Sequence, residues 1–262
     1  MALPDFGFGN VEQDLWQLIF IMVRIGAALL AAPLFGAASV PVQLRIAMAG
    51  AIGVFVLTWT PAAAQMPGDL LTLPAMLAIL GEAVVGFAFG FVLQLAFAAP
   101  LLAAEQIAGA MGMAIATAVD PNTGGQSGAL GQYFTVVLTL IFLSVGGHLL
   151  WLNLLIESYT AFPPGGEWFG AERALIVAGF AGQMLATAVA IALPVTLVLL
   201  LVQMVTGVLS RSAPSLNLFS LGLPAGVLAG IAGLIAAMPL LTDQFVSLSM
   251  LAIAQIEGLF AL

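Results

Sequence analysis

The sequence has no cysteine and no lysine, and only 6% of its 262 residues are charged. Without cysteine, the chain can form no disulfide, holds no cysteine-ligated metal cluster and has no thiol nucleophile. Its four cations are all arginines, Arg24, Arg45, Arg173 and Arg211, so the net charge of −8 reflects missing bases. We expect no nucleic-acid binding, because there is no basic surface to bind phosphates.

Hydrophobic residues make up 63% of the chain, whereas soluble domains carry about 25% charged residues. Too little polar surface remains to cover a soluble fold. The composition and the long apolar runs predict an all-α, polytopic membrane protein of about six long, kinked helical segments that form hairpins. The segments fall at residues 15–32, 44–60, 75–99, 129–156, 174–209 and 218–241, followed by an apolar tail at 245–262.

Prolines divide this pattern. Pro33, Pro61 and Pro100 are predicted to end the first three segments, because proline lacks a backbone donor and clashes with the preceding turn. Pro194 is predicted to kink the fifth segment. As one straight helix that segment would reach about 50 Å, against a hydrocarbon core of about 30 Å.

The stretch from residue 105 to 128 departs from the apolar pattern. Small residues recur at every fourth position on one side of the predicted helix, namely Ala104, Ala108, Gly112 and Ala116. Larger apolar residues line the other side, namely Ile107, Met111, Ile115 and Val119. Pro121 is predicted to stop this helix, Asp120 and Pro121 favour a turn, and Gly124 and Gly125 allow positive φ.

Two other segments carry glycine at helical spacing. Gly86 and Gly90 lie in the third segment, and Gly222, Gly226 and Gly230 lie in the sixth. In a membrane, small residues four positions apart let two helix backbones approach closely. We therefore expect these glycines to mark helix-packing faces.

Three charges, Arg24, Glu82 and Glu105, lie within or beside apolar segments. A charge at mid-membrane costs at least about 2.5 kcal/mol on insertion scales, so it faces protein or water. Two interpretations stay open: a proton or ion path, and structural pairing or contact with water at a helix end. The structural interpretation is favoured.

The remaining polar residues do not form a recognisable catalytic or metal site. His148 is the single histidine, and no acidic residue or cysteine lies three or four positions away, so a metal site is not expected. Residues 120–131 begin like a calcium loop but have Gly124 at the fifth position and Gly131 at the twelfth. The sequence predicts no cofactor and no enzymatic activity.

Four stretches together resemble one known family. They are FIMVRIGAALLAAPLFGAASVPVQLRIAMA (20–49), EQIAGAMGMAIATAVDPNTGGQS (105–127), GGHLLWLNLLIESYTAFPPG (146–165) and GVLSRSAPSLNLFSLGLPAGVLAGI (207–231). They resemble the FliR family, the R component of the type III export gate, over nearly the whole chain. Composition alone does not indicate this family.

The resemblance implies a gate subunit in the bacterial inner membrane at the flagellar basal body. Such a subunit joins P and Q components around a pore for unfolded flagellar proteins, its cargo, and the gate's cytoplasmic base contacts a B-type switch protein. Residues 1–170 would correspond to a P-like part and residues 171–262 to a Q-like part. Because basic residues are scarce here, basic contacts to the switch protein are not expected.

The resemblance also implies that residues 109–127 contribute to a plug inside the pore. A glycine-rich backbone can rearrange as cargo passes, and apolar side chains can narrow a pore against water and ions. The residues carried over are Gly109, Met111, Gly112, Met113, Ile115, Asp120, Pro121, Gly124 and Gly125.

Three alternatives stay open from the residues alone. The chain could belong to a virulence injectisome instead of a flagellum. It could be a secondary transporter or ion channel, for which broken helices and the intramembrane charges Arg24 and Glu82 are typical. An intramembrane enzyme would need His148 or Glu82 for turnover, and their spacing does not favour it.

Overall fold

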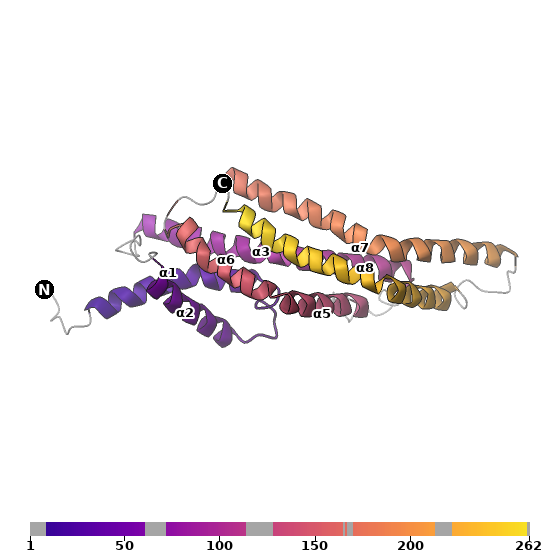
Figure 1. Cartoon of the computed structure of the whole chain (residues 1–262), viewed down its shortest axis with the longest axis horizontal. Coiled ribbons are helices and arrows are strands. Elements are labelled where there is room, and N and C mark those ends of the chain that lie inside the picture. The colour runs from indigo at the N-terminus through magenta and orange to yellow at the C-terminus, as the bar shows by residue number, and fades with distance from the viewer. Residues whose placement is uncertain are drawn as a thin grey trace. The chain divides into compact units, whose positions relative to one another are not determined.

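The computed structural model describes residues 9–60, 72–113, 128–164, 166, 170–212 and 222–260. Every regular element in these ranges is a helix (Figure 1). The helices are α1 (Gly9–Ala31), α2 (Val42–Trp59), α3 (Leu73–Ala110), α5 (Ala129–Ser144), α6 (Gly147–Ala161), α7 (Ala171–Ser212) and α8 (Leu223–Gly258). In the described ranges, five helices are long and apolar enough to cross a membrane, or six if α5 and α6 form one broken span. The predicted fold class is confirmed.

Two predicted breaks are wrong, one of them at a proline. Helix α3 continues through Pro100. Helix α8 continues through residues 242–244 and joins the predicted sixth segment to the apolar tail, and Pro239 lies inside it. The prediction treated proline as a helix end, but in apolar surroundings a helix tolerates it when neighbouring groups satisfy the freed backbone carbonyl.

One predicted segment is broken instead. Residues 129–156 were expected to form a single helix, but α5 ends at Ser144 and α6 begins at Gly147. Gly146 has φ +74°, a left-handed conformation that glycine adopts without a Cβ clash. The helix is therefore interrupted at Gly146, although the apolar run continues on both sides of it.

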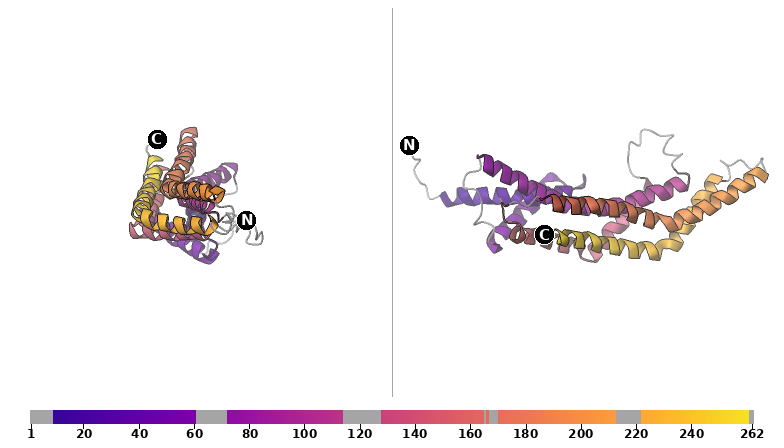
Figure 2. Two further views of the ribbon diagram at one scale, coloured as in Figure 1. Left: turned by 90° about the vertical axis from the view of Figure 1, so that its right-hand side faces the viewer. Right: turned by 90° about the horizontal axis from the view of Figure 1, so that it is seen from above.

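Three helices exceed the thickness of a bilayer. Helices α3, α7 and α8 contain 38, 42 and 36 residues, which correspond to roughly 54–63 Å against a hydrocarbon core of about 30 Å. The ribbon of α7 is bent within its length (Figure 2), and this helix contains Pro194. By contrast, α2 has 18 residues, about 27 Å, and matches one bilayer.

The chain folds into two compact units, and the long helices contribute to both. Unit 1 comprises Met1–Gln94, Gly146–Phe180 and Ala252–Leu262. Here α1 and α2 form a hairpin in which Gly53 packs on Leu18 and Met22. Helix α6 packs on α1 and on the first part of α3, and its buried Trp151 donates from Nε1 to the Phe89 carbonyl at 3.2 Å.

Unit 2 comprises Leu95–Val145 and Ala181–Leu251. Its core contains edge-to-face aromatic pairs, Phe97 with Phe142 and Phe134 with Phe245. These four rings are buried and connect the second part of α3 to α5, and α5 to α8. The predicted division of the chain near residue 170 stays a prediction.

Candidate functional site

Helix α3 ends at Ala110, at the start of the segment 109–127 that is predicted to form the plug. The N–H of Met113 donates to the Ala108 carbonyl at 3.0 Å, and the N–H of Gly112 donates to the Gly109 carbonyl at 3.0 Å. This pair of bonds is a Schellman motif, which places a left-handed residue after the helix. Gly112 supplies it with φ +82°.

The expectation that the helix continues through Gly112 to Pro121 is therefore wrong at Gly112. The row of small residues on this helix is predicted to be a packing face, but Gly112, one of its members, ends the helix instead. Residues 114–127 lie outside the described residues, and they include Ile115, Asp120, Pro121, Gly124 and Gly125.

Met111, at the end of α3, packs against the glycine face of α8 within unit 2. The Met111 side chain is buried and lies directly over Gly230. A Cβ added at Gly230 would lie 2.5 Å from the Cγ and Cε atoms of Met111. A Cβ added at Gly226 would lie 3.0 Å from the Met111 carbonyl oxygen. The absence of side chains at Gly226 and Gly230 thus permits this contact.

A second helix of unit 2 also contacts the end of α3. The side-chain amide of Gln203, on α7, donates from Nε2 to the Ala110 carbonyl at 2.6 Å. The end of α3 is therefore held by its own Schellman bonds, by α8 through Met111 and by α7 through Gln203.

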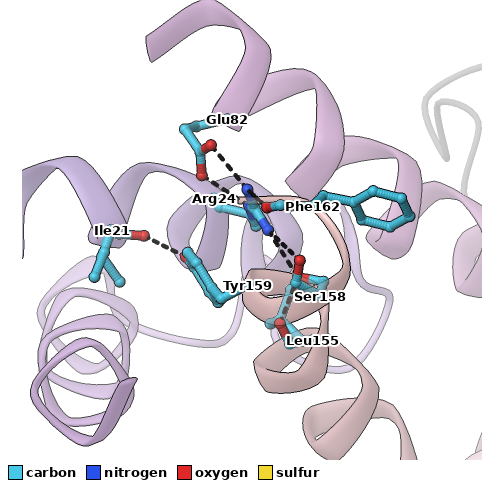
Figure 3. A network of polar contacts seen from close by, with 7 residues as sticks. All are labelled: Ile21, Arg24, Glu82, Leu155, Ser158, Tyr159 and Phe162. Atoms are coloured by element: carbon cyan, nitrogen blue, oxygen red, sulfur yellow. Dashed lines mark hydrogen bonds and ion pairs between the residues drawn. The ribbon is translucent and has the colours of Figure 1, made fainter. Parts of the chain in front are cut away.

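Unit 1 contains a buried polar cluster centred on Arg24 of α1 (Figure 3). Its guanidinium forms a two-bond pair with Glu82 of α3, with Nε–Oε2 at 2.7 Å and Nη2–Oε1 at 2.8 Å. Nη1 donates to the carbonyl and hydroxyl of Ser158, and Nη2 also donates to the Phe162 carbonyl. All five N–H groups of the guanidinium are thereby bonded.

Tyr159 of α6 contacts α1 twice, through its ring and through its hydroxyl. Its ring lies under the guanidinium, with Arg24 Cζ 4.2 Å from the ring centroid. Its hydroxyl donates to the Ile21 carbonyl at 2.7 Å (Figure 3). Arg24, Glu82, Ser158 and Tyr159 are all buried. The cluster therefore joins α1, α3 and α6 through direct, charge-assisted bonds between buried groups.

Beside this cluster, Gly86 and Gly90 bring the α3 backbone onto α1. A Cβ at Gly86 would clash with the Arg24 carbonyl oxygen and would lie 2.9 Å from the Ala27 Cβ. A Cβ at Gly90 would lie 2.5 Å from the Ala28 carbonyl oxygen and the Ala31 Cβ. Any larger residue at either position would force the two helices apart.

The other predicted site residues lie as follows. Glu105 is exposed on the part of α3 that belongs to unit 2, Gly109 is exposed one position before the end of α3, and Met113 is half-buried. Gly222 immediately precedes α8. The Nδ1 atom of His148 is buried, and it has no hydrogen-bond partner within the described part of the chain. In the same part, no three acidic or histidine side chains gather where they could hold a metal ion.

Sequence reasoning missed four residues of these two sites: Gln203, Ser158, Tyr159 and Phe162. Ser158 and Tyr159 are adjacent polar residues in an apolar segment, which is a usable signal because buried polar groups need partners. Phe162 contributes its backbone carbonyl, and a backbone group leaves no signal in the residue type. Gln203 is one of two glutamines in a 42-residue apolar helix, the other being Gln183, and its amide is a signal of the same kind.

Comparison with known proteins gives the family. The model of the bacterial export proteins, family 1, matches residues 15–251. The flagellar biosynthetic protein FliR of Bacillus subtilis (strain 168) is 31% identical over 251 residues, which cover 93% of this chain and 94% of the relative. The FliR protein of Escherichia coli (strain K12) is 30% identical over 226 residues, which cover 86% of this chain and 84% of the relative.

A relative from a second system also matches. The surface presentation of antigens protein SpaR of Salmonella typhimurium (strain LT2) is 30% identical over 194 residues, covering 73% of this chain and 72% of the relative. The family model matches most of the chain. Five helices in the described part of the chain are long and apolar enough to span a membrane. The chain belongs to the bacterial export proteins of family 1, the family of FliR, and is a membrane component of a type III protein-export apparatus.

Proposed function

We propose that the chain is a non-enzymatic gate subunit of the flagellar type III export channel, in the bacterial inner membrane at the flagellar basal body. It assembles with P and Q components into a pore for unfolded flagellar proteins. Residues 109–127 help to plug that pore, and a B-type switch protein contacts the cytoplasmic base of the gate. Residues 1–170 form the P-like part and residues 171–262 the Q-like part.

The observation that carries the plug assignment is the seating of Met111 on Gly230 at the end of α3. A plug needs a fixed base, because a segment attached to a mobile helix end would not return to one closed position. The contacts of Met111 and Gln203 supply that base within unit 2. The bend at Gly112 directs the chain out of the helix immediately afterwards.

The assembly proposal is supported by apolar surface that the chain leaves uncovered. Along α7, Leu197, Leu201, Met204 and Val208 are 52–67% exposed, and they recur at three- or four-residue spacing on one face. On α8, Leu228, Ile231 and Ile235 are also exposed. Helices α7 and α8 are too long for one bilayer, so partner subunits are needed to cover the parts that extend beyond it.

The transporter alternative is weakened by the Arg24 cluster. A transported ion or proton would need a free ligand or a titratable carboxylate beside an open path. Glu82 accepts both of its bonds from Arg24, and the side chains of both residues are almost fully buried. This arrangement favours a structural pair over an ion path.

Co-purification tests the assembly. An affinity-tagged chain, expressed with untagged P and Q components and extracted in mild detergent, should retain both components through size-exclusion chromatography. A chain that purifies alone and binds a small solute would support the transporter alternative and contradict the gate proposal. A tagged, unrelated polytopic protein of similar size controls for nonspecific hydrophobic capture.

A motility test separates flagellar from injectisome membership. The flagellar proposal rests on FliR relatives that match 86–93% of the chain, whereas SpaR matches 73%. Deleting the gene should abolish swimming and the export of flagellar filament protein, and a plasmid copy should restore both. Normal swimming together with lost secretion of virulence effectors would assign the chain to an injectisome.

A further inference from the structure

Phe162 ends α6, and its backbone carbonyl bonds outside the helix. The N–H of Phe162 donates to the Ser158 carbonyl at 2.8 Å, but the backbone at Phe162 has φ −124° and ψ 85°, which are not helical values. Pro163 follows, and the residue before a proline is disfavoured in the helical conformation. The Phe162 carbonyl therefore turns away from α6 and accepts from Arg24 Nη2 at 2.9 Å (Figure 3). The last carbonyls of a helix have no donor within it, so the packing of the Phe162 side chain decides where this carbonyl lies.

The Phe162 ring is buried and is held by two side chains from other parts of unit 1. It stacks on the Phe260 ring, with centroids 5.5 Å apart and an interplanar angle of 14°. The Arg173 guanidinium of α7 also lies over the Phe162 ring, with Cζ 4.9 Å from the centroid. Phe260 in turn contacts Phe89 of α3 edge to face, with centroids 5.8 Å apart. Displacement of the Phe162 ring would therefore break an aromatic contact and a cation–π contact.

Phe260 belongs to a short segment that follows α8. Helix α8 ends at Gly258, and the N–H groups of Leu259 and Phe260 donate back to carbonyls of its last turn at 3.0 Å. Leu259 is fully buried, and its carbonyl accepts from Arg173 Nε at 3.2 Å. A cation at this position is favourable, because the carbonyl end of a helix carries partial negative charge. We call Leu259 and Phe260 the α8 strap. Arg173 therefore binds both the strap and the Phe162 ring.

We propose that the α8 strap holds the Arg24 cluster in its bonded geometry, with Arg173 and Phe260 as positioning residues. Together they fix the Phe162 ring, and the ring fixes the carbonyl that accepts from Arg24. Release of the strap lets Phe162 move, and Arg24 Nη2 then keeps its bond to Glu82 alone. The cluster joins α1, α3 and α6, and the strap extends this connection to the parts of α7 and α8 that belong to unit 1. This role does not depend on the gate function proposed above.

The geometry of a guanidinium makes its bond to this carbonyl sensitive to displacement. The five N–H groups of Arg24 point in fixed directions in one plane, and a hydrogen bond weakens steeply as its acceptor leaves the direction of the N–H group. Arg24 is 1% exposed, so a lost bond leaves a buried N–H group of a charged side chain unpaired. A shift of Phe162 therefore reaches Arg24 through one identifiable bond, the one at Nη2.

The test uses the full chain in detergent micelles, with isotope-labelled arginine observed by NMR. Because the chain has four arginines and no lysine, the side-chain signals are few, and each is assigned by its loss on substitution. Hydrogen exchange of the Nη and Nε protons is measured for Arg24 and for Arg45. Arg45 also belongs to unit 1 and donates to the carbonyls of residues 35 to 37, so it reports any general loosening of the unit.

Four variants are compared with wild type. Phe260→Ala removes the ring of the strap, and Arg173→Leu removes the cation but leaves both rings in place. Arg173→Lys keeps a cation and a donor. Phe142→Ala removes a buried ring in unit 2 and controls for the general cost of losing an aromatic side chain.

We expect Phe260→Ala and Arg173→Leu to accelerate exchange at Arg24 Nη by about ten-fold or more, the effect of losing one hydrogen bond to a charged group. Exchange at Arg24 Nε, which bonds Glu82, should change less, and Arg45 should match wild type. Arg173→Lys should recover most of the protection. Phe142→Ala should leave the Arg24 protons at their wild-type exchange rates.

Two results would overturn the role of the strap. One is wild-type exchange at Arg24 Nη in both Phe260→Ala and Arg173→Leu. The other is equal acceleration at Arg24 and Arg45, or in Phe142→Ala and Phe260→Ala, because the effect would then be a general loss of stability. If Phe260→Ala does not fold, the comparison of Arg173→Leu with Arg173→Lys decides between these outcomes.

Discussion

Arg24 and Glu82 lie 58 residues apart in sequence and form a two-bond ion pair between α1 and α3, at 2.7 and 2.8 Å. Every N–H group of the guanidinium is bonded to Glu82, Ser158 or Phe162. The pair therefore acts as a fixed connection inside unit 1. Any change that removes one charge leaves the other charge buried without an opposite charge beside it.

Glu82→Gln is expected to destabilise the chain by about 3–5 kcal/mol, the usual cost of leaving one member of a buried pair unpaired. The double variant Arg24→Met with Glu82→Leu should recover much of this loss, because it removes both charges. Thermal unfolding of the detergent-purified protein measures the effect. Glu105→Gln, at an exposed position, is the control, and an equal loss from Glu82→Gln and Glu105→Gln would contradict a structural role for the pair.

Gly86→Ala is expected to cost about 1–3 kcal/mol, because the added methyl group clashes with the Arg24 carbonyl and forces α3 away from α1. Gly81→Ala is the matched control on the same helix, since a Cβ there meets nothing within 4 Å. The control should stabilise the helix by roughly 0.5–1 kcal/mol, the difference in helix propensity. The same unfolding assay compares them, and a neutral Gly86→Ala would refute close packing at this site.

Tyr159→Phe removes a second donor to the Ile21 carbonyl, which keeps its bond inside α1, and we expect a loss of about 0.5–1.5 kcal/mol, the net contribution of one hydrogen bond. The other tyrosine of the chain provides the comparison. Tyr133 is exposed, so Tyr133→Phe should change stability by no more than about 0.5 kcal/mol. If the two variants unfold at the same temperature, the Tyr159 hydroxyl contributes nothing to the fold.

The α1–α2 hairpin is expected to face lipid. Trp16 and Trp59 are 49% and 77% exposed and lie at one end of the hairpin, and Arg45 at the other end donates to the carbonyls of Phe35 and Ala37. Tryptophan and arginine at the two ends of an apolar hairpin are typical of the two membrane interfaces.

Single-tryptophan variants measure this exposure. In vesicles with brominated lipids, chains that retain only Trp16 or only Trp59 should be quenched. A chain that retains only Trp151, which is fully buried and bonded to the Phe89 carbonyl, should stay fluorescent. Protection of Trp16 and Trp59 in the assembled complex would mean that partner subunits, and not lipid, cover the hairpin.

Much of the fold was predictable because it depends on composition and periodicity. Long apolar runs predict helices, and the glycines four residues apart at Gly86 and Gly90 lie where the backbones of α3 and α1 approach closely. Helix ends were harder to predict. Pro100 and Pro239 lie inside helices, whereas Gly146 and Gly112 break or end them, because the outcome depends on which backbone groups neighbouring helices can satisfy.

The sites were only partly predictable for a related reason. Arg24 and Glu82 stand out as charges in apolar helices, but their pairing requires α1 and α3 to pack in one register. Gln203 and Ala110 are 93 residues apart, and no local pattern connects them. Contacts between a side chain and a distant backbone carbonyl depend on tertiary structure alone.

The central claim is that residues 109–127 help to close the pore, and resting ion conductance tests it most directly. Complexes of P and Q components with either the wild-type chain or a chain lacking residues 114–127 are reconstituted into planar bilayers at equal copy number. The deletion leaves Met111 and the Schellman motif in place, so the base of the loop is retained. The account predicts a low resting conductance for wild type and a clearly higher one for the deletion. Equal conductance from two fully assembled complexes would contradict it.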